Sequence, residues 1–154
     1  MRIDILSKEY PPAIYGGAGV HVTELVTALR QRGDLDVRVH AFGEPRDEDG
    51  TTGHPDLAEL AGANPALTTL GVDLSLAAAC EGADLVLFGQ QASDSDGAVL
   101  WAAVAERLRR PVISQVAELT LSDGKARGKR QTEFGYDVIE APLPVVVAVS
   151  DAIN

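Results

Sequence analysis

Short apolar runs alternate with amphipathic stretches along this chain. Short, mainly apolar runs at Ile3 to Ser7, Leu85 to Phe88 and Val145 to Val149 are typical of strands buried on both faces of a parallel sheet. Between them, apolar residues recur every three or four positions from Val20 to Leu29 and from Ala66 to Cys80, as one face of a helix requires. The pattern therefore predicts strands that alternate with helices.

The second half of the chain adds a helix, a strand and a hairpin. A helix is expected over residues 97–110, and residues 112–121 begin a further strand. The turn Ser122-Asp123-Gly124 contains the Asp-Gly pair that is typical of a tight hairpin. Residues 125–134 then alternate basic and polar side chains. We therefore expect an antiparallel hairpin excursion near residues 116–141.

These elements predict one α/β domain over residues 1–154. Residues 36–42 supply the remaining strand, and polar residues 43–65 form a long excursion with a helical turn near residues 57–60. Such alternation predicts a three-layer sandwich with a doubly wound parallel sheet, flavodoxin-like or Rossmann-like, in the strand order 2-1-3-4-5. Ligands of this winding bind beyond the carboxyl ends of the first and third strands, where the order reverses.

Composition narrows the classes of partner. The formal net charge is -10 and the sequence pI is about 4.6. An acidic chain is poorly suited to nucleic acid or to an anionic membrane surface, so neither is expected as a partner. No apolar stretch approaches the ~20 residues that span a bilayer. With one cysteine, Cys80, and no signal-peptide pattern, we expect a cytoplasmic protein.

A glycine cluster opens the first predicted helix. Gly16, Gly17 and Gly19 lie where backbone N–H groups at a helix start attract anions. The run from Tyr10 to Leu25 resembles the opening of bacterial glycogen synthases, and the resemblance extends over residues 1–82. It implies that the glycine loop lies against a sugar-nucleotide donor. The alternative is that the glycines only serve the turn between strand and helix.

A second loop follows the third predicted strand. Residues 84–97 resemble the interior of the beta subunit of electron transfer flavoproteins, and the resemblance continues to residue 154. In that family the matching loop helps to hold AMP with backbone donors facing the phosphate. The alternative is an acidic loop that caps the next helix and binds no ligand. The resemblance implies these candidate ligand-binding residues: Gly89, Gln90, Gln91, Ser93, Ser95 and Gly97.

Two unrelated resemblances in one chain suggest a junction near residues 82–86. On this basis the sequence predicts an engineered or recombinant fold chimera with no evolved catalytic activity, and not an enzyme. One alternative is a module that binds an adenine nucleotide weakly (AMP, ADP or ADP-glucose), and a second is a glycosyltransferase fragment. No cofactor is expected to be required beyond weak AMP or ADP binding. The partner chains of the two parental families are not expected to bind.

The remaining chemically active residues predict little chemistry. His21 is most often a cap or surface residue at such a position, and His40 and His54 look too isolated for a metal site, so none is expected. Cys80 ends an apolar helix pattern and is expected to be a small packing residue. The basic run at 125–130 is typical of a solvated face or of a protected edge strand.

Overall fold

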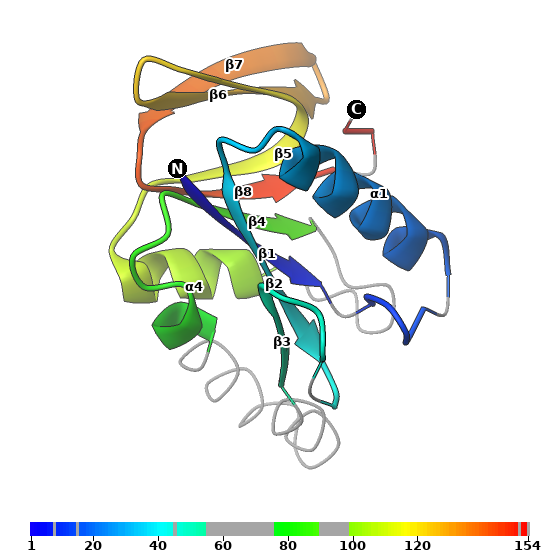
Figure 1. Cartoon of the computed structure of the whole chain (residues 1–154). Coiled ribbons are helices and arrows are strands. Elements are labelled where there is room, and N and C mark those ends of the chain that lie inside the picture. The colour runs from blue at the N-terminus through cyan, green and yellow to red at the C-terminus, as the bar shows by residue number, and fades with distance from the viewer. Residues whose placement is uncertain are drawn as a thin grey trace.

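The chain folds around one mixed sheet, shown in Figure 1. The computed structural model describes residues 1–154 apart from 8, 15, 45, 55–75, 90–98, 151 and 154. Among the described residues the sheet has eight strands in the order β3-β2-β1-β4-β8-β5-β6-β7. The elements are β1 (Arg2–Ser7), α1 (Gly17–Gln31), β2 (Asp36–Phe42), β3 (Thr51–His54), β4 (Leu85–Gly89), α4 (Leu100–Leu108), β5 (Val112–Ser122), β6 (Lys125–Thr132), β7 (Gly135–Pro142) and β8 (Val145–Val149).

Helices cover both faces of the parallel part of the sheet. β3, β2, β1, β4 and β8 run parallel, and Ile3 of β1 pairs with Leu85 of β4. In Figure 1, α1 lies on one side of these strands and α4 on the other. The predicted α/β fold with a doubly wound, Rossmann-like sheet is therefore confirmed.

The alternation of side chains along each strand divides the core into two clusters. In β1, Ile3 and Ile5 face α1 and pack in one cluster with Val26. Leu6 belongs to the second cluster, beneath α4, together with Val86, Phe88, Val104, Cys80 and Val146. Successive residues of a strand point to opposite faces, so one apolar run serves both layers.

The order of the last two parallel strands differs from the prediction. In the predicted order 2-1-3-4-5, the strand at 145–149 would lie outside the strand at 112–121. Instead β8 lies between β4 and β5, and pairs with both. β8 reads Val-Val-Val-Ala-Val and suits burial on both faces, whereas β5 alternates buried and exposed positions. The continuous apolar strand therefore takes the central position.

β5 links the parallel sheet to the predicted antiparallel excursion. Its register with β8 shifts between Ile113 and Val116, and Gln115 between them has a φ of 57°. Beyond this bulge β5 pairs antiparallel with β6, and β6 pairs with β7. Asp123 and Gly124, with φ values of 52° and 70°, make the predicted Asp-Gly turn. The hairpin excursion near 116–141 is confirmed, and it continues the same sheet.

The opposite edge of the sheet contains a strand that the sequence pattern did not predict. Within the polar excursion at 43–65, β3 pairs parallel with β2 and forms the edge strand. The predicted helical turn at 57–60 and most of the predicted helix at 66–80 lie outside the described residues; helical residues 76–79 are its described end. None of the described helices is both long and apolar enough to cross a membrane.

Candidate functional site

The strand order reverses between β1 and β4. From this central pair the chain continues outward to β2 and β3 on one side and to β8 and β5 on the other. Leu6 pairs with Phe88, so Ser7 and Gly89 end neighbouring strands at the same edge. This edge is the crevice in which doubly wound folds bind ligands. The second candidate loop follows Gly89 in the chain. Its remaining candidates lie outside the described residues: Gln90, Gln91, Ser93, Ser95 and Gly97.

A carboxylate of the chain itself sits on the first glycine loop. The backbone N–H groups of Gly16 and Gly19 donate to Oε2 of Glu9, over 3.0 and 3.3 Å. These N–H groups lie at the start of α1, where no carbonyl of the helix itself can accept from them. The N-cap residue, Gly16, has no side chain that could do so. Glu9 thus occupies the place that an anionic ligand would take at a helix start. Glu9 is not recognisable as a site residue from the sequence, because no local motif predicts this contact.

The glycines differ in the space around them. A Cβ atom added at Gly17 or at Gly89 would meet no atom of the described residues within 4 Å. One added at Gly19 would lie 3.0 Å from the Cβ of Glu9 and from Cγ2 of Ile14. Gly19 is therefore needed for close packing of the loop, as the purely structural interpretation predicts. Gly17 and Gly89 have space beside them among the described residues, and they remain candidates for ligand contact.

A charged network around the buried Asp4 lies at the start of β1, on the α4 side of the sheet. Arg2 donates to both carboxylate oxygens of Asp4, over 2.9 and 2.6 Å, and to the carbonyl oxygens of Ala79 and Glu81. Burial alone would raise the pKa of the Asp4 carboxyl, but His40 and Arg2 outweigh burial and lower it. Asp4 therefore stays ionised inside the protein, and Arg2 links β1 to the end of the helix at residues 76–79.

The two histidines that looked isolated in the sequence touch each other. Nδ1 of His40 lies 3.1 Å from Nε2 of His54, and Nε2 of His40 lies 3.6 Å from Oδ2 of Asp4. The prediction that they are isolated is wrong, because pairing of β2 with β3 brings these distant positions together. Cys80 is fully buried beside Asp4, as its predicted packing role requires, and burial raises the pKa of its thiol to about 12.

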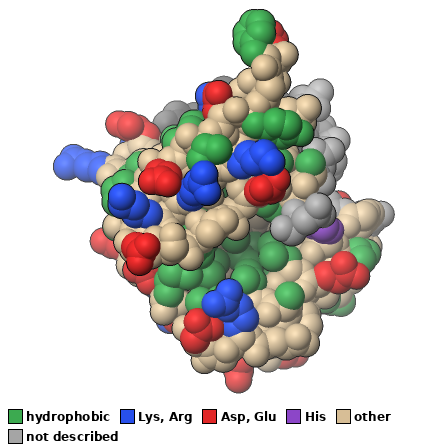
Figure 2. Space-filling model, turned by 90° about the horizontal axis from the view of Figure 1, so that it is seen from above, with side chains coloured by type: hydrophobic (Ala, Val, Ile, Leu, Met, Phe, Trp, Pro, Cys, Tyr) green, Lys and Arg blue, Asp and Glu red, His purple; other side chains and the backbone are tan. Residues whose placement is uncertain are grey.

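A hydrophobic groove opens on the other face, between α1 and the antiparallel strands. Its volume is about 810 Å³. Leu25 and Leu29 of α1 line one side, and Leu119 and Leu121 of β5 line the other. Figure 2 shows the hydrophobic hollow, with charged side chains around it. His21 lies at its border on α1, which makes it a surface residue. The described residues do not show what covers this groove.

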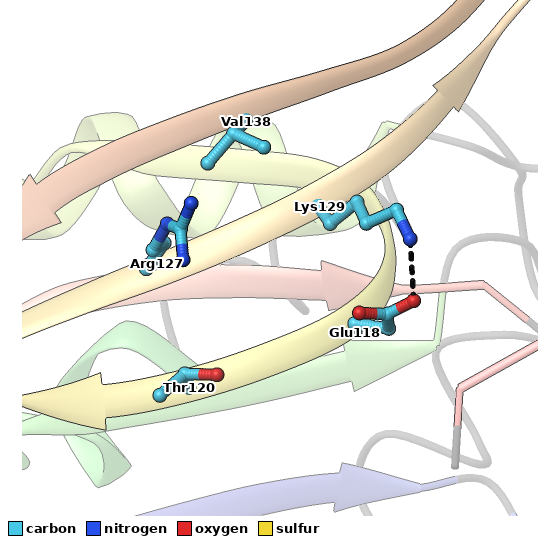
Figure 3. A pocket seen from close by; sticks show the side chains of 5 residues that line it. All are labelled: Glu118, Thr120, Arg127, Lys129 and Val138. Carbon is cyan, nitrogen blue, oxygen red and sulfur yellow. Dashed lines mark hydrogen bonds and ion pairs between the residues drawn. The ribbon is translucent and has the colours of Figure 1, made fainter.

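The basic run of the hairpin is held in ion pairs. Lys129 contacts Glu118 at 2.6 Å, as Figure 3 shows, and Arg130 contacts Asp137 at 3.3 Å. Lys129 also lies 4.6 Å from the ring centroid of Tyr136. The hollow at these residues is small, about 210 Å³. These side chains join neighbouring strands, which agrees with the predicted solvated face.

Comparison with known proteins relates the chain to two groups. Over 86 residues it is 51% identical to alpha-maltose-1-phosphate synthase of Mycolicibacterium smegmatis, covering 56% of this chain and 21% of that protein. Over 74 residues it is 38% identical to electron transfer flavoprotein subunit beta of Mycobacterium leprae, covering 48% of this chain and 28% of that subunit. Over 71 residues it is 42% identical to caffeyl-CoA reductase-Etf complex subunit CarD of Acetobacterium woodii, covering 46% of this chain and 27% of that protein.

These relatives correct the functional prediction. The chain spans only 21% to 28% of the length of these curated relatives. Their names support both resemblances at the level of glycosyl transfer and electron transfer, with a maltose-1-phosphate synthase in place of a glycogen synthase. The prediction of an engineered protein without evolved activity is wrong, because these matches point to natural electron-transfer and glycosyl-transfer families.

A family model covers most of the chain. The model described as "Electron transfer flavoprotein domain" matches residues 58–154. The match begins before the junction predicted at 82–86 and includes β4, α4 and all strands from β5 to β8. The chain therefore belongs to the electron transfer flavoprotein domain family.

Proposed function

We propose that this chain works in electron transfer as a domain that binds an adenine nucleotide and catalyses no reaction of its own. The observation that carries the proposal is the switch point within a domain of this family. There β1 and β4 end side by side, and each leads into one of the two candidate loops. Among the described residues, Gly17 and Gly89 have space beside them that a ligand could use.

Glycosyl transfer is a second candidate, favoured by one observation. The 51% identity over 86 residues to a maltose-1-phosphate synthase is higher than the identity to the electron-transfer relatives. In this alternative the glycine loop at the start of α1 would receive the diphosphate of a sugar nucleotide. The helix N-terminus supplies the donors that a phosphate needs.

We also infer that the chain joins segments of two natural families near residues 82–86. The two groups of relatives, each matching about half of the chain, support this inference. Gly82 has a φ of 84° in an exposed turn, so a junction there leaves the buried strands whole. The backbone N–H of Asp84 donates to the carbonyl of Arg2 over 3.0 Å, which keeps β4 in register with β1.

The first test is thermal unfolding, followed by the fluorescence of Trp101, with AMP or with ADP-glucose. A nucleotide at ten times its Kd should stabilise the fold by about 1.4 kcal/mol and raise the Tm by several degrees. A shift with AMP that Gly89→Val abolishes supports the electron-transfer proposal. A shift with ADP-glucose that Gly17→Val abolishes supports the glycosyl-transfer alternative.

These variants separate binding from folding. Neither added Cβ meets an atom of the described part of the chain within 4 Å, so the Tm of both variants should lie close to that of the unmodified chain. Gln31→Val, at the far end of α1, is the matched control and should keep any nucleotide response. A Tm that neither nucleotide moves would overturn nucleotide binding by this domain.

Replacement of Glu9 by Gln is expected to increase anion binding at α1. The carboxylate of Glu9 now satisfies the N–H groups of Gly16 and Gly19, so a phosphate must displace it. Removal of the charge should tighten the binding of AMP or ADP-glucose several-fold and cost about 1 kcal/mol of stability through the lost cap. Isothermal titration calorimetry measures the change. Unchanged or weaker binding would show that the ligand does not use this helix end.

A further inference from the structure

Three different metal-binding side chains meet in the buried layer between β1, β2 and the helical residues 76–79. Ligand atoms of Asp4, His40 and Cys80 all lie within 4.8 Å of one another. The three residues are 0%, 6% and 0% exposed. A carboxylate, an imidazole and a thiol are the donor types that zinc binds in proteins.

His40 has one nitrogen with no hydrogen-bond partner among the described residues. That atom is Nε2, and the nearest acidic atom is Oδ2 of Asp4 at 3.6 Å, too far for a hydrogen bond. The other nitrogen, Nδ1, contacts Nε2 of His54 at 3.1 Å. When Nε2 carries a proton, that proton faces the carboxylate and lowers the pKa of Asp4. When Nδ1 donates to His54 instead, the lone pair of Nε2 faces the carboxylate, and a cation between the two atoms would be bound by both.

We propose that Asp4, His40 and Cys80 bind a divalent transition-metal ion of the zinc class. Tetrahedral zinc, with bonds of about 2.0–2.2 Å to nitrogen and oxygen, separates two such ligands by roughly 3.4 Å. The observed 3.6 Å between His40 and Asp4 is close to that spacing. Sγ of Cys80 lies within 4.8 Å of the other two ligand atoms, so an approach of up to about 1 Å would complete three protein ligands, with a water molecule as the fourth.

The surroundings of the cluster bear on this site in two ways. His54 acts as an outer partner, because its contact with Nδ1 orients the ring of His40 and directs Nε2 at the ion. Arg2 also binds the carboxylate of Asp4, and its positive charge opposes the ion. Binding requires the thiol of Cys80 to lose its proton, so one proton is released to solvent for each ion bound. These costs make the site reversible and dependent on free metal.

Titration of the metal-free chain with cobalt(II) tests the site directly. A tetrahedral site with a thiolate ligand should give strong visible bands and a sulfur-to-cobalt charge-transfer band, which saturate at one ion for each chain. Zinc should displace the cobalt and abolish both bands. Zinc should also raise the Tm of the unmodified chain, since it binds only the folded site.

Matched variants assign the ligands. Cys80→Ser, close in size, should lose the charge-transfer band, and His40→Gln should lower cobalt affinity at least tenfold. His54→Gln should weaken binding about 10–100-fold without removing the charge-transfer band, as expected for an outer partner. His21→Gln, an exposed histidine on α1, is the control and should change nothing.

The outcomes divide clearly. Cobalt spectra without a charge-transfer band, or bands that survive in Cys80→Ser, would overturn the proposal. Loss of the bands in His21→Gln would also contradict it, because cobalt would then be bound at the surface. If Cys80→Ser unfolds, the decision rests on His54→Gln, which changes an edge strand outside the core clusters.

Discussion

Replacement of Asp4 by Asn is expected to lower the free energy of unfolding by about 3 kcal/mol at neutral pH in metal-free buffer. Asp4 is fully buried and accepts two hydrogen bonds from Arg2, so the change leaves a guanidinium without its counter-charge. Removing one partner of a buried ion pair typically costs about 3–5 kcal/mol. Chemical denaturation followed by Trp101 fluorescence measures the loss.

The neighbouring strand offers a matched control. Asp36 and Arg38 of β2 form the same kind of pair two residues apart, at 3.0 Å, with both side chains exposed to solvent. Asp36→Asn should therefore change stability by less than about 1 kcal/mol. Equal losses for the two variants would show that burial of Asp4 does not determine the energy of its ion pair.

The contribution of Asp4 to the free energy of unfolding should depend on pH. Its interactions hold the pKa of the folded carboxyl below the ordinary value of about 3.9. The stabilisation is therefore complete above that value and is lost as the pH falls through the lower pKa of the folded state. The stability difference between the unmodified chain and Asp4→Asn should shrink as the pH falls below about 4. A difference that stays constant down to pH 2 would contradict the lowered pKa.

Truncation of Leu85 to Ala is expected to destabilise the chain by about 3 kcal/mol. Leu85 is 1% exposed, pairs with Ile3 across the centre of the sheet and belongs to the core cluster under α1. Loss of a buried leucine side chain and the cavity that remains typically cost about 2–5 kcal/mol. Val112→Ala, at a site that is 40% exposed, should cost much less and serves as the control.

Leu85 also tests whether the two segments of the chain, before and after the inferred junction, fold as one unit. Ile3 and Leu85 lie on opposite sides of the inferred junction and are in register on β1 and β4. A double-mutant cycle with Ile3→Val should therefore show a coupling of about 0.5–3 kcal/mol, and unfolding should be a single transition. Strict additivity or two separate transitions would indicate that the segments fold independently.

The sequence predicted the elements of the fold because their signals are local. The apolar runs of β1, β4 and β8 and the Asp123-Gly124 turn are encoded by neighbouring residues. The order of β5 and β8 is not local. The order depends on which of the two strands can be buried on both faces of the sheet. The apolar composition of β8 favours the inner position but does not by itself specify its neighbours.

The candidate site was predictable only in part. The glycines that follow β1 and β4 are visible as motifs, and the fold places these strand ends together. The contact of Glu9 with the N-terminus of α1 could not be foreseen, because it depends on the path of the loop between them.

The sequence by itself determined the α/β class, the buried strands, the hairpin and the two family resemblances. The first three depend on the short-range pattern of apolar and turn residues, and the resemblances depend on short sequence motifs. Only the tertiary structure decided that His40 meets His54 and faces Asp4 and Cys80. Residues far apart in the chain become neighbours through strand pairing and helix packing. The contacts that result lower the pKa of Asp4, and burial raises the pKa of Cys80.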